Sequence, residues 1–397
     1  MTMRERYLDD LIIQDALQSH KIAFISGPRQ VGKTTMAKSI LKKFDQSENY
    51  YSWDDDEFRL AWIRSIKQLI QGKKLAVFDE IHKDRAWKSK LKGLYDTLGE
   101  ETKFIVSGSA RMDYYRKSGD SLQGRYFPYR LHPFSLGEIP SLKKPPELSW
   151  EEGHRRPDFK LDDLLELSGF PEPLLGGNKG KAARWRKLYR ERLMREDIRD
   201  LYQIRELSSL ENLSLLLTSK VGSQLSYESL RQDLSCSFDT ILRWIDILES
   251  VYYCYRLRPY SKKIKNAIKK EPKLFLFDWS SAETKGAKLE NLIAGHLLKN
   301  VHAWTDAALG DFELYYLRDK QKREVDFFIT KDGAPYLLLE VKSNQSTPTN
   351  SLCYFQNILK PTFCFQLIQD QRRESRQSLL YPGIQVISVE RFLSAIN

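Results

Sequence analysis

Short apolar runs alternate with longer segments of helical spacing over the first 140 residues. The runs 22–25, 75–78 and 104–106 are continuously apolar, as is typical of strands buried on both faces of a parallel sheet. Between them, residues 60–70 and 87–98 carry apolar side chains at helical spacing. This alternation predicts an α/β fold for this part of the chain, with helices on both faces of a parallel sheet.

The pattern changes at residues 140–157, where prolines, glycines and charges interrupt it as in a linker. Residues 161–217 have a mostly helical pattern and are strongly charged. From about residue 279 the pattern predicts a separate α/β unit, in the order helix, strand, strand, helix, strand.

Residues 210–278 have the pattern of a winged helix, in which two helices precede a two-stranded wing. The pattern consists of helices at 227–234 and 238–250 and strands at 252–257 and 274–277. The second helix has one apolar face. Its charged residues are three acids and one base, Asp239, Asp246, Glu249 and Arg243. Because this set is net negative, the helix is a poor surface for reading DNA bases.

Composition narrows the class of protein. The chain has 397 residues, 41% hydrophobic and 29% charged, with 20 glycines and 15 prolines, which excludes a collagenous or largely disordered chain. No apolar run approaches the ~18–20 residues that span a bilayer, and the first ten residues do not resemble a signal peptide. The cysteines lack CxxC spacing and matching histidine pairs: Cys236, Cys254, Cys353 and Cys364. We expect a cytoplasmic protein without zinc, disulfides or a membrane partner.

Positive charge is concentrated in residues 252–273. The formal net charge of the chain is +11, and eight bases minus one acid give +7 in this stretch. The bases are Arg256, Arg258, Lys262, Lys263, Lys265, Lys269, Lys270 and Lys273, the acid is Glu271, and the interleaved tyrosines are Tyr252, Tyr253, Tyr255 and Tyr260. This density of bases attracts phosphate backbones of any sequence, which indicates DNA as a partner. A solvated basic loop is the alternative.

Residues 27–34 read GPRQVGKT and match the nucleotide-binding pattern GxxxxGK[ST]. The motif follows an apolar strand and opens a helix through Leu41, which is the context that this pattern requires. We expect backbone N–H groups to surround the β-phosphate, Lys33 to reach the β- and γ-phosphates, and Thr34 to bind Mg²⁺. The predicted ATP-binding residues are Gly27, Pro28, Arg29, Gln30, Val31, Gly32, Lys33, Thr34 and Thr35.

Two acids, Asp79 and Glu80, end the apolar strand at 75–78. Asp79 is predicted to join Thr34 in holding Mg²⁺, and Glu80 to polarise the attacking water. Solvated acids at a strand end are the alternative, and the buried strand before them argues against it. The sequence therefore predicts ATP hydrolysis as well as ATP binding.

Three further residues are weaker candidates for catalysis. Ser107 and Ser109 follow the third strand, where their hydroxyls could sense the γ-phosphate, although a strand-ending turn has the same residues. Arg125 precedes a strand-like segment at 126–131 and could neutralise transition-state charge across the interface of a homo-oligomer. An ordinary surface arginine is the alternative.

Taken together, the segments GPRQVGKTT, VFDEIH, SGSA, the GR pair and HPFSLGEI resemble a family of prokaryotic AAA-like ATPases. The opening RYLDDLI, residues 168–171 and residues 197–278 extend the resemblance over nearly the whole chain. Members join the ATPase to a winged helix and a C-terminal restriction-endonuclease-like domain. The resemblance implies ATPase roles for Lys33, Thr34, Asp79 and Glu80. We accordingly predict an AAA-like P-loop ATPase domain at 1–139, a helical linker or lid at 140–208, a winged helix at 209–279 and a nuclease-like domain at 280–397.

The last part of the chain contains an arrangement that resembles PD-(D/E)XK nucleases. Its polar residues are Glu290 on a helix, Asp326 on a strand, and Glu340 and Lys342 on one face of the next strand, after a turn at 331–333. Asp326 and Glu340 are candidate Mg²⁺ ligands, and the lysine can help to activate water or stabilise charge. A paired Glu and Lys on an exposed strand is the alternative, and a nuclease-like fold does not establish cleavage.

Three functions stay open at this point. ATP hydrolysis could control a Mg²⁺-dependent nuclease domain on DNA, or it could drive a switch whose C-terminal domain only binds nucleic acid or protein. A signalling or defence ATPase with a protein partner is the third. The basic stretch and the four polar residues of the last part favour the first.

Overall fold

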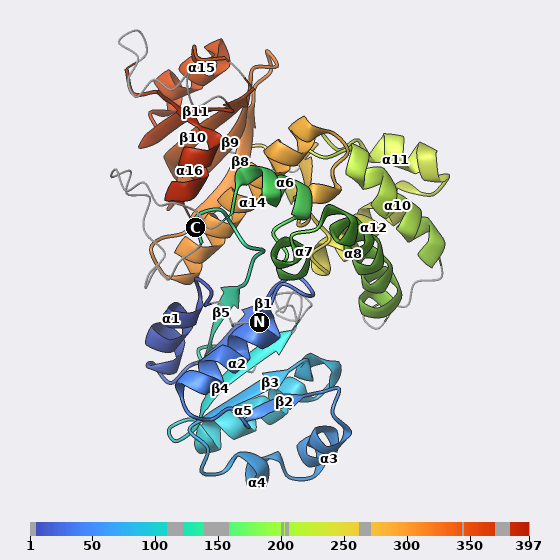
Figure 1. The fold of residues 1–397 in the computed structure, drawn as a ribbon, viewed down its shortest axis with the longest axis vertical. Coiled ribbons are helices and arrows are strands. Elements are labelled where there is room, and N and C mark those ends of the chain that lie inside the picture. Colours follow the sequence, from blue (N-terminus) through green and yellow to red (C-terminus); the bar gives the residue numbers. More distant parts are fainter. Residues whose placement is uncertain are drawn as a thin grey trace. The chain divides into compact units, whose positions relative to one another are not determined.

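The computed structural model describes residues 5–108, 122–138, 159–199, 202, 206–261, 271–343, 345–369 and 382–396. These residues form two compact units, one mainly from residues up to Pro133 and the other mainly from residues that begin at Phe134 (Figure 1). Within the described ranges, no helix is long and apolar enough to cross a membrane.

A parallel five-stranded sheet forms the centre of the first unit, in the order β2-β3-β4-β1-β5. The strands are β1 (Ile22–Ser26), β2 (Tyr50–Ser52), β3 (Leu75–Asp79), β4 (Lys103–Gly108) and β5 (Tyr126–Arg130). The helices are α1 (Asp9–Ile12), α2 (Lys33–Lys43), α3 (Asp56–Arg64), α4 (Ile66–Ile70) and α5 (Trp87–Leu98). The predicted α/β fold with a parallel sheet is confirmed for this unit.

The hydrophobic core of the first unit follows the alternation of side chains along its strands. Phe24, Phe78 and Phe104 point to the face on which α3, α4 and α5 pack. α2 contributes nothing to that cluster and instead contacts β3 and β4 from the other face. Helices therefore cover both faces, which explains why the strands are continuously apolar.

Strand order also determines which residues meet at the carboxyl edge of this sheet. Ser26 at the end of β1 pairs with Gly108, and Asp79 at the end of β3 pairs with Ser107. Because β4 lies between β1 and β3, its last residues lie between the loop that follows β1 and the acid that ends β3.

The first half of the second unit is helical and ends in a two-stranded antiparallel ribbon. The helices are α6 (Leu161–Leu167), α7 (Pro171–Gly176), α8 (Lys179–Arg192), α10 (Leu207–Ser219), α11 (Tyr227–Leu234) and α12 (Phe238–Ser250), and the ribbon pairs β6 (Cys254–Leu257) with β7 (Lys273–Leu276). The helices predicted at 227–234 and 238–250 and the two strands after them are confirmed as elements.

A mixed five-stranded sheet completes the second unit, in the order β12-β11-β10-β9-β8. Its elements are α14 (Lys285–Asp306), β8 (Phe312–Arg318), β9 (Glu324–Lys331), β10 (Ala334–Lys342), α15 (Asn350–Leu359), β11 (Phe363–Ile368), β12 (Gln385–Ser388) and α16 (Val389–Ala395). The predicted order of elements omits β8, β12 and α16 and is wrong in that respect. β8 and β12 are the edge strands of the sheet, and β8 is partly exposed, so its apolar pattern is weaker.

A short segment that begins at Phe134, after β5, belongs to the second unit. Leu136 donates its backbone N–H to Nε2 of His296 at 3.0 Å, and Lys299 pairs with Glu138 and donates to Ser135 at 2.8 Å. Burial lowers the pKa of His296 to about 3, so the ring is neutral and can accept this hydrogen bond. Residues 134–138 of the HPFSLGEI stretch thus have a structural role in the second unit.

Candidate functional site

The loop between β1 and α2 has a backbone that requires glycine. Gly27 has φ of +154°, and a Cβ there would lie 2.3 Å from the carbonyl oxygen of Leu131. Gly32 has φ of +104° and directly precedes α2, which begins at Lys33. The two glycines therefore allow the loop to turn tightly and to direct the first N–H groups of α2 into the loop.

Lys33 and Arg6 stabilise this loop from within. The ammonium group of Lys33 donates to the carbonyl oxygens of Gly27 at 2.9 Å and Pro28 at 2.8 Å. The guanidinium group of Arg6, which is buried, donates to the carbonyl oxygen of Val31 at 2.8 Å. Lys33 is therefore held over the loop that is predicted to bind the phosphates.

A network of hydroxyl groups holds the carboxylate of Asp79. Ser107 donates to Oδ1 at 2.6 Å, and Thr34 donates to Oδ2 at 3.3 Å. Tyr50 on β2 also donates to Oδ2, and burial, together with the charge of Asp79, raises the pKa of its hydroxyl. Asp79 and Thr34, the predicted Mg²⁺ ligands, are thus in direct contact.

Glu80 lies just beyond the sheet edge in an unusual conformation. Its φ is +57°, and its backbone N–H donates to the carbonyl oxygen of Ser107 at 2.9 Å. Its carboxylate is 3.4 Å from Nε2 of His82, a buried ring whose pKa is lowered by burial. This left-handed backbone re-aims the side chain relative to that of Asp79, which belongs to the regular strand.

The remaining residues predicted for this site differ in their exposure to solvent and in their contacts. Arg29 and Gln30 are half-buried in the loop, and Thr35 is exposed on α2. The hydroxyl of Ser107 contacts Asp79 and its side chain is buried, while Ser109 lies outside the described residues.

Arg125 lies at the amino ends of the strands, opposite the end at which the nucleotide-binding loop lies. Its carbonyl oxygen accepts from the N–H of Ile22, the first residue of β1, and its guanidinium group pairs with Asp96 at 2.8 Å. The nucleotide loop follows the other end of β1, about 13 Å along a five-residue strand. Arg125 therefore does not contribute to the site of its own chain, and a role across an interface stays a prediction.

Sequence reasoning missed two contributors to this site. Tyr50 stands before a weak apolar run, and no local pattern connects it to Asp79, 29 residues away. His82 belongs to the VFDEIH segment, and its spacing of two from Glu80 was a signal that could have identified it.

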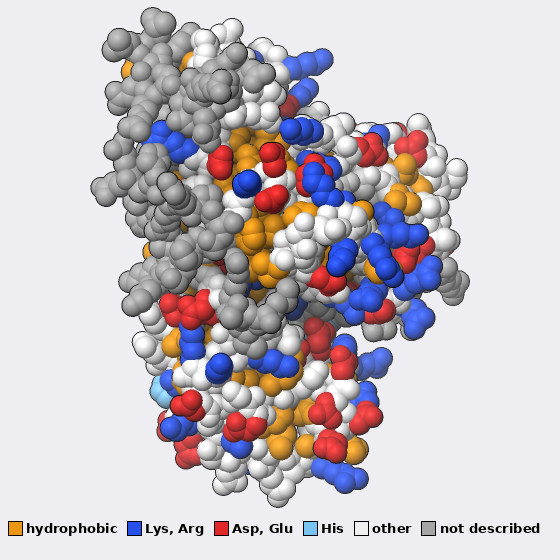
Figure 2. Space-filling model, viewed as in Figure 1, with side chains coloured by type: hydrophobic (Ala, Val, Ile, Leu, Met, Phe, Trp, Pro, Cys, Tyr) orange, Lys and Arg blue, Asp and Glu red, His pale blue; other side chains and the backbone are white. Residues whose placement is uncertain are grey.

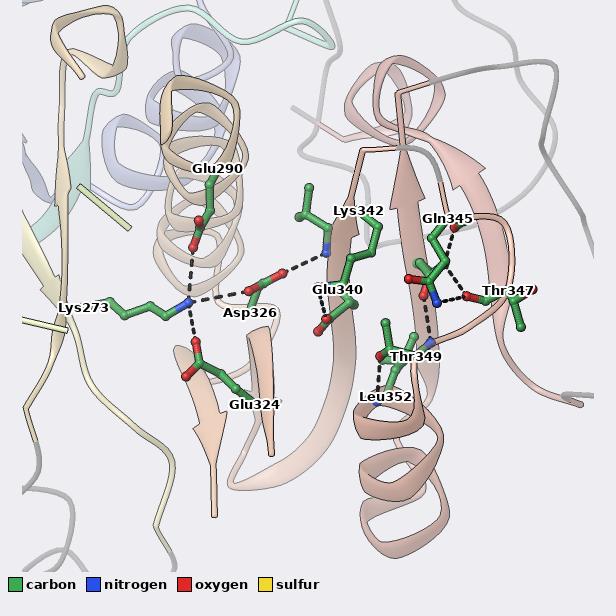
Figure 3. A network of polar contacts seen from close by, with 12 residues as sticks. Lys273, Glu290, Glu324, Asp326, Glu340, Lys342, Gln345, Thr347, Thr349 and Leu352 are labelled. Carbon is green, nitrogen blue, oxygen red and sulfur yellow. Dashed lines mark hydrogen bonds and ion pairs between the residues drawn. The ribbon is translucent and has the colours of Figure 1, made fainter. Parts of the chain in front are cut away.

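A second site gathers the four polar residues predicted for the last part of the chain (Figure 3). β9 and β10 are antiparallel, and the pairing of Leu339 with Phe327 brings Glu340 next to Asp326. Asp326 accepts from the backbone N–H of Val341 at 2.9 Å, and Lys342 pairs with Glu340 at 2.6 Å. We call Glu290, Glu324, Asp326 and Glu340 the carboxylate centre.

Lys273 on β7 lies in the middle of the carboxylate centre. Its ammonium nitrogen is 2.8 Å from Glu324, 3.2 Å from Glu290 and 3.5 Å from Asp326 (Figure 3). The lysine is 4% exposed. Across the described part of the chain, no group of three or more His, Cys, Asp or Glu side chains is arranged to hold a metal ion. The ammonium group balances part of the negative charge of three of these acids, Glu290, Glu324 and Asp326.

The ionisation of the centre reflects burial opposed by charge. Burial raises the pKa of Glu290 to about 7, although Lys273 acts in the opposite direction. Burial and the charge of Asp326 raise the pKa of Glu340 to about 7. Burial lowers the pKa of Lys273, but the neighbouring carboxylates outweigh this effect and the net shift is upward. Lys273 therefore stays charged.

Sequence reasoning missed Lys273, Glu324 and Gln366 as members of this site. Glu324 precedes Asp326 by two on one strand, a spacing that places both on the same face and could have identified it. Gln366 pairs with Glu340 in the sheet, and its amide nitrogen donates to the carbonyl oxygen of Gln345 at 2.6 Å. It thereby holds the segment that follows Lys342.

The structure corrects the prediction that residues 252–273 form one phosphate-binding surface. Arg256 is neutralised by Asp246 at 2.5 Å and Glu249 at 2.6 Å. Lys273 is buried, as are three of the tyrosines expected to stack on bases, Tyr252, Tyr253 and Tyr255. Burial in the core removes these side chains from any nucleic acid. Arg258 is exposed, and the lysines at 262–270 lie outside the described residues.

α8 provides a basic surface that the sequence analysis did not single out. The helix carries seven bases and one acid, and five of the bases are exposed: Lys179, Lys181, Arg184, Lys187 and Arg192. Lys and Arg side chains gather over this helix on the face shown in Figure 2. Ala182, Trp185 and Tyr189 are buried on the other side of the helix, while Leu188 is exposed beside the bases, so the basic side is the solvent side.

Four uncharacterized relatives are similar to most of this chain, among them proteins of Haemophilus influenzae and Methanocaldococcus jannaschii. The first is 23% identical over 81% of this chain and 84% of its own length, and the second 24% identical over 80% and 73%. A Mycobacterium tuberculosis relative is 23% identical over 85% and 74%.

Among solved structures, the Thermotoga maritima RuvB Holliday junction branch migration motor is similar at 15% identity and a TM-score of 0.32, covering 66% of this chain and 93% of that one. Aquifex aeolicus DnaA bound to AMPPCP is similar at 17% identity and a TM-score of 0.33, covering 61% of this chain and 86% of that one.

Three parts of the chain match family models. Residues 158–285 and 285–392 match two domains of unknown function. Residues 19–140 match the family model of an AAA domain, and the match includes the GPRQVGKT motif at 27–34.

Proposed function

We propose that the protein hydrolyses ATP at the loop between β1 and α2. The observation that carries the proposal is the contact between Thr34 and Asp79, at 3.3 Å, beside the ammonium group of Lys33. It brings together a phosphate-binding loop and an acidic strand end that are 45 residues apart. Glu80 follows directly, so the nucleotide-binding and hydrolytic groups share one sheet edge.

Each side chain has a distinct role in this proposal. Thr34 and Asp79 offer hydroxyl and carboxylate oxygens, which are the ligands that Mg²⁺ prefers, and the cation neutralises phosphate charge when bound. When ATP binds, the ammonium group of Lys33 contacts the β- and γ-phosphates in place of the carbonyl oxygens of the loop. Glu80, fixed by its backbone and by His82, orients the attacking water.

The test is the rate of phosphate release from ATP by Glu80→Gln, together with its nucleotide affinity. The variant keeps the size of the side chain and loses the carboxylate, so we expect turnover to fall about 10²- to 10⁴-fold while ATP still binds. Glu101→Gln, an exposed glutamate at the amino end of β4, is the matched control. Hydrolysis by Glu80→Gln at the wild-type rate contradicts the assignment.

We further propose that the second unit binds DNA by contacting the phosphate backbone of the DNA. The exposed bases of α8 support this proposal, and the PD-(D/E)XK-like order of the carboxylate centre supports a nuclease-like domain that follows a winged helix. Because Lys273 lies among the carboxylates, the geometry favours a switch or a controlled activity over constitutive cleavage. A homo-oligomer would supply Arg125 from one chain to the site of another.

The DNA proposal is tested by measuring affinity against salt concentration. Replacing Lys181, Arg184 and Lys187 together by Gln should weaken binding equally for any DNA sequence, and the salt slope should fall by roughly one for each phosphate that is no longer neutralised. Three exposed bases of the first unit, Arg64, Lys67 and Lys74, replaced by Gln, give a control with the same change in charge. Equal losses of affinity in both triple variants would show that only net charge matters and that α8 is not the DNA-binding surface.

A further inference from the structure

Lys273 lies among oxygen atoms that separate elements contribute. The lysine comes from β7, Glu290 from α14, and Glu324 and Asp326 from β9. One carboxylate oxygen from each of the three acids lies between 2.8 and 3.5 Å from the ammonium nitrogen. Such a convergence of oxygens is what a hard divalent cation also requires, at shorter distances of about 2.0–2.6 Å.

The ammonium group does not satisfy every oxygen of the centre. Glu340 is 3% exposed, and its Oε2 has no hydrogen-bond partner among the described residues. Lys342 pairs with the other oxygen, Oε1, at 2.6 Å. A buried carboxylate oxygen without a partner is costly, and here it belongs to the side chain next to Asp326 (Figure 3). This oxygen can therefore serve as a ligand to a cation.

Bases and packed backbone border the carboxylate centre. Four acids meet three bases, which are Lys273, Lys342 and Arg318, the last paired with Glu324 at 2.5 Å. Gly222 packs closely against Glu290, because a Cβ there would lie 2.8 Å from Oε2 of this acid. Its backbone N–H donates to the carbonyl oxygen of Leu274, next to Lys273, at 2.9 Å.

We propose that Lys273 is an internal cation that occupies a divalent-cation site of the carboxylate centre, and that the centre binds Mg²⁺ or Mn²⁺ only after this ammonium group is removed. The proposal rests on the nuclease-like centre described above and adds the group that controls it. It predicts that the wild-type protein does not bind the metal at Asp326, and that loss of one positive charge on β7 creates the site.

The test compares Mn²⁺ binding by nucleotide-free wild-type protein and Lys273→Met, using calorimetry. The substitution keeps an unbranched side chain of similar length while it removes the charge that competes for the oxygens. We expect one additional bound Mn²⁺ per chain, with affinity at least about 100-fold above that of the wild type at this centre, because the competing charge lies within a few ångströms of the site. Lys273→Arg, which keeps the charge, should behave like the wild type.

Two further variants locate the added ion. Asp326→Asn in the Lys273→Met background should remove the additional site. Tb³⁺, which takes similar oxygen ligands, should show luminescence sensitised by Tyr316, whose ring centre is 5.7 Å from the ammonium nitrogen of Lys273. Lys299→Met is the matched control, because Lys299 is also buried and pairs with a carboxylate outside the centre, Glu138. It should create no site.

The outcomes separate this inference from the nuclease-like centre itself. Mn²⁺ binding by the wild type that is lost in Asp326→Asn would support the centre and overturn the role of Lys273. Absence of Mn²⁺ binding at this centre in both the wild type and Lys273→Met would overturn both. If Lys273→Met does not fold, the double variant Lys273→Met/Glu324→Gln removes one of the acids that Lys273 neutralised. The same measurements of Mn²⁺ binding are then made on the double variant, with the same interpretation.

Discussion

Removing the hydroxyl of Ser107 is the perturbation that most directly probes the nucleotide site. Ser107 is fully buried at the end of β4, and its hydroxyl donates to Oδ1 of Asp79 at 2.6 Å. The side chain is therefore placed to orient the carboxylate that we propose as a Mg²⁺ ligand. Ser107→Ala removes this one hydrogen bond and leaves Tyr50 and Thr34 on the other oxygen.

The expected magnitude follows from the charge of the acceptor. A hydrogen bond to an ionised group contributes about 1.5–3 kcal/mol net. At about 1.4 kcal/mol per tenfold, this range corresponds to about 10- to 150-fold. Because two donors remain on Asp79, we expect the lower half, about 10- to 40-fold, as a loss of ATPase rate at limiting Mg²⁺.

The assay is steady-state phosphate release as a function of Mg²⁺ concentration. A residue that only orients Asp79 should raise the Mg²⁺ requirement, and excess Mg²⁺ should restore much of the rate. Thr102→Val is the matched control, since its hydroxyl donates to the carbonyl oxygen of Lys73 at 2.7 Å near the other end of β4. An unchanged Mg²⁺ dependence in Ser107→Ala, or an equal change in Thr102→Val, would refute the reasoning.

Three further predictions concern other parts of the molecule. Arg125→Ala should lower ATP turnover without changing nucleotide affinity if the arginine acts across an interface, and mixing with Lys33→Ala subunits should restore part of the rate; a fully active monomer contradicts this. Gly27→Ala should destabilise the first unit and weaken ATP binding, because its Cβ would overlap the carbonyl of Leu131, and thermal unfolding with and without nucleotide measures both. Stability should fall as pH drops from about 6.5 towards 3, because unfolding exposes His296 to protonation while the folded ring stays neutral. His296→Gln should show a smaller decline in melting temperature over that interval, and an identical decline would exclude the histidine as its source.

Features that depend on neighbours along the chain can be predicted from the amino-acid sequence. The P-loop, the acids Asp79 and Glu80, and the helices at 227–234 and 238–250 are recognisable because spacing and apolar pattern act over a few residues. The ExK pair of Glu340 and Lys342 follows from the same local rule. The division of the chain into four parts stays a prediction.

Which charged side chains are accessible to a ligand depends on contacts that form only in the folded protein. Lys273 has the same local sequence signal as the other bases of 252–273, yet it is buried among carboxylates 17 to 53 residues away. Arg125 follows a glycine before a strand, and strand direction alone places it at the edge opposite the nucleotide loop. The partners that neutralise, bury or orient a charged side chain come from distant segments, and a sequence pattern does not record them.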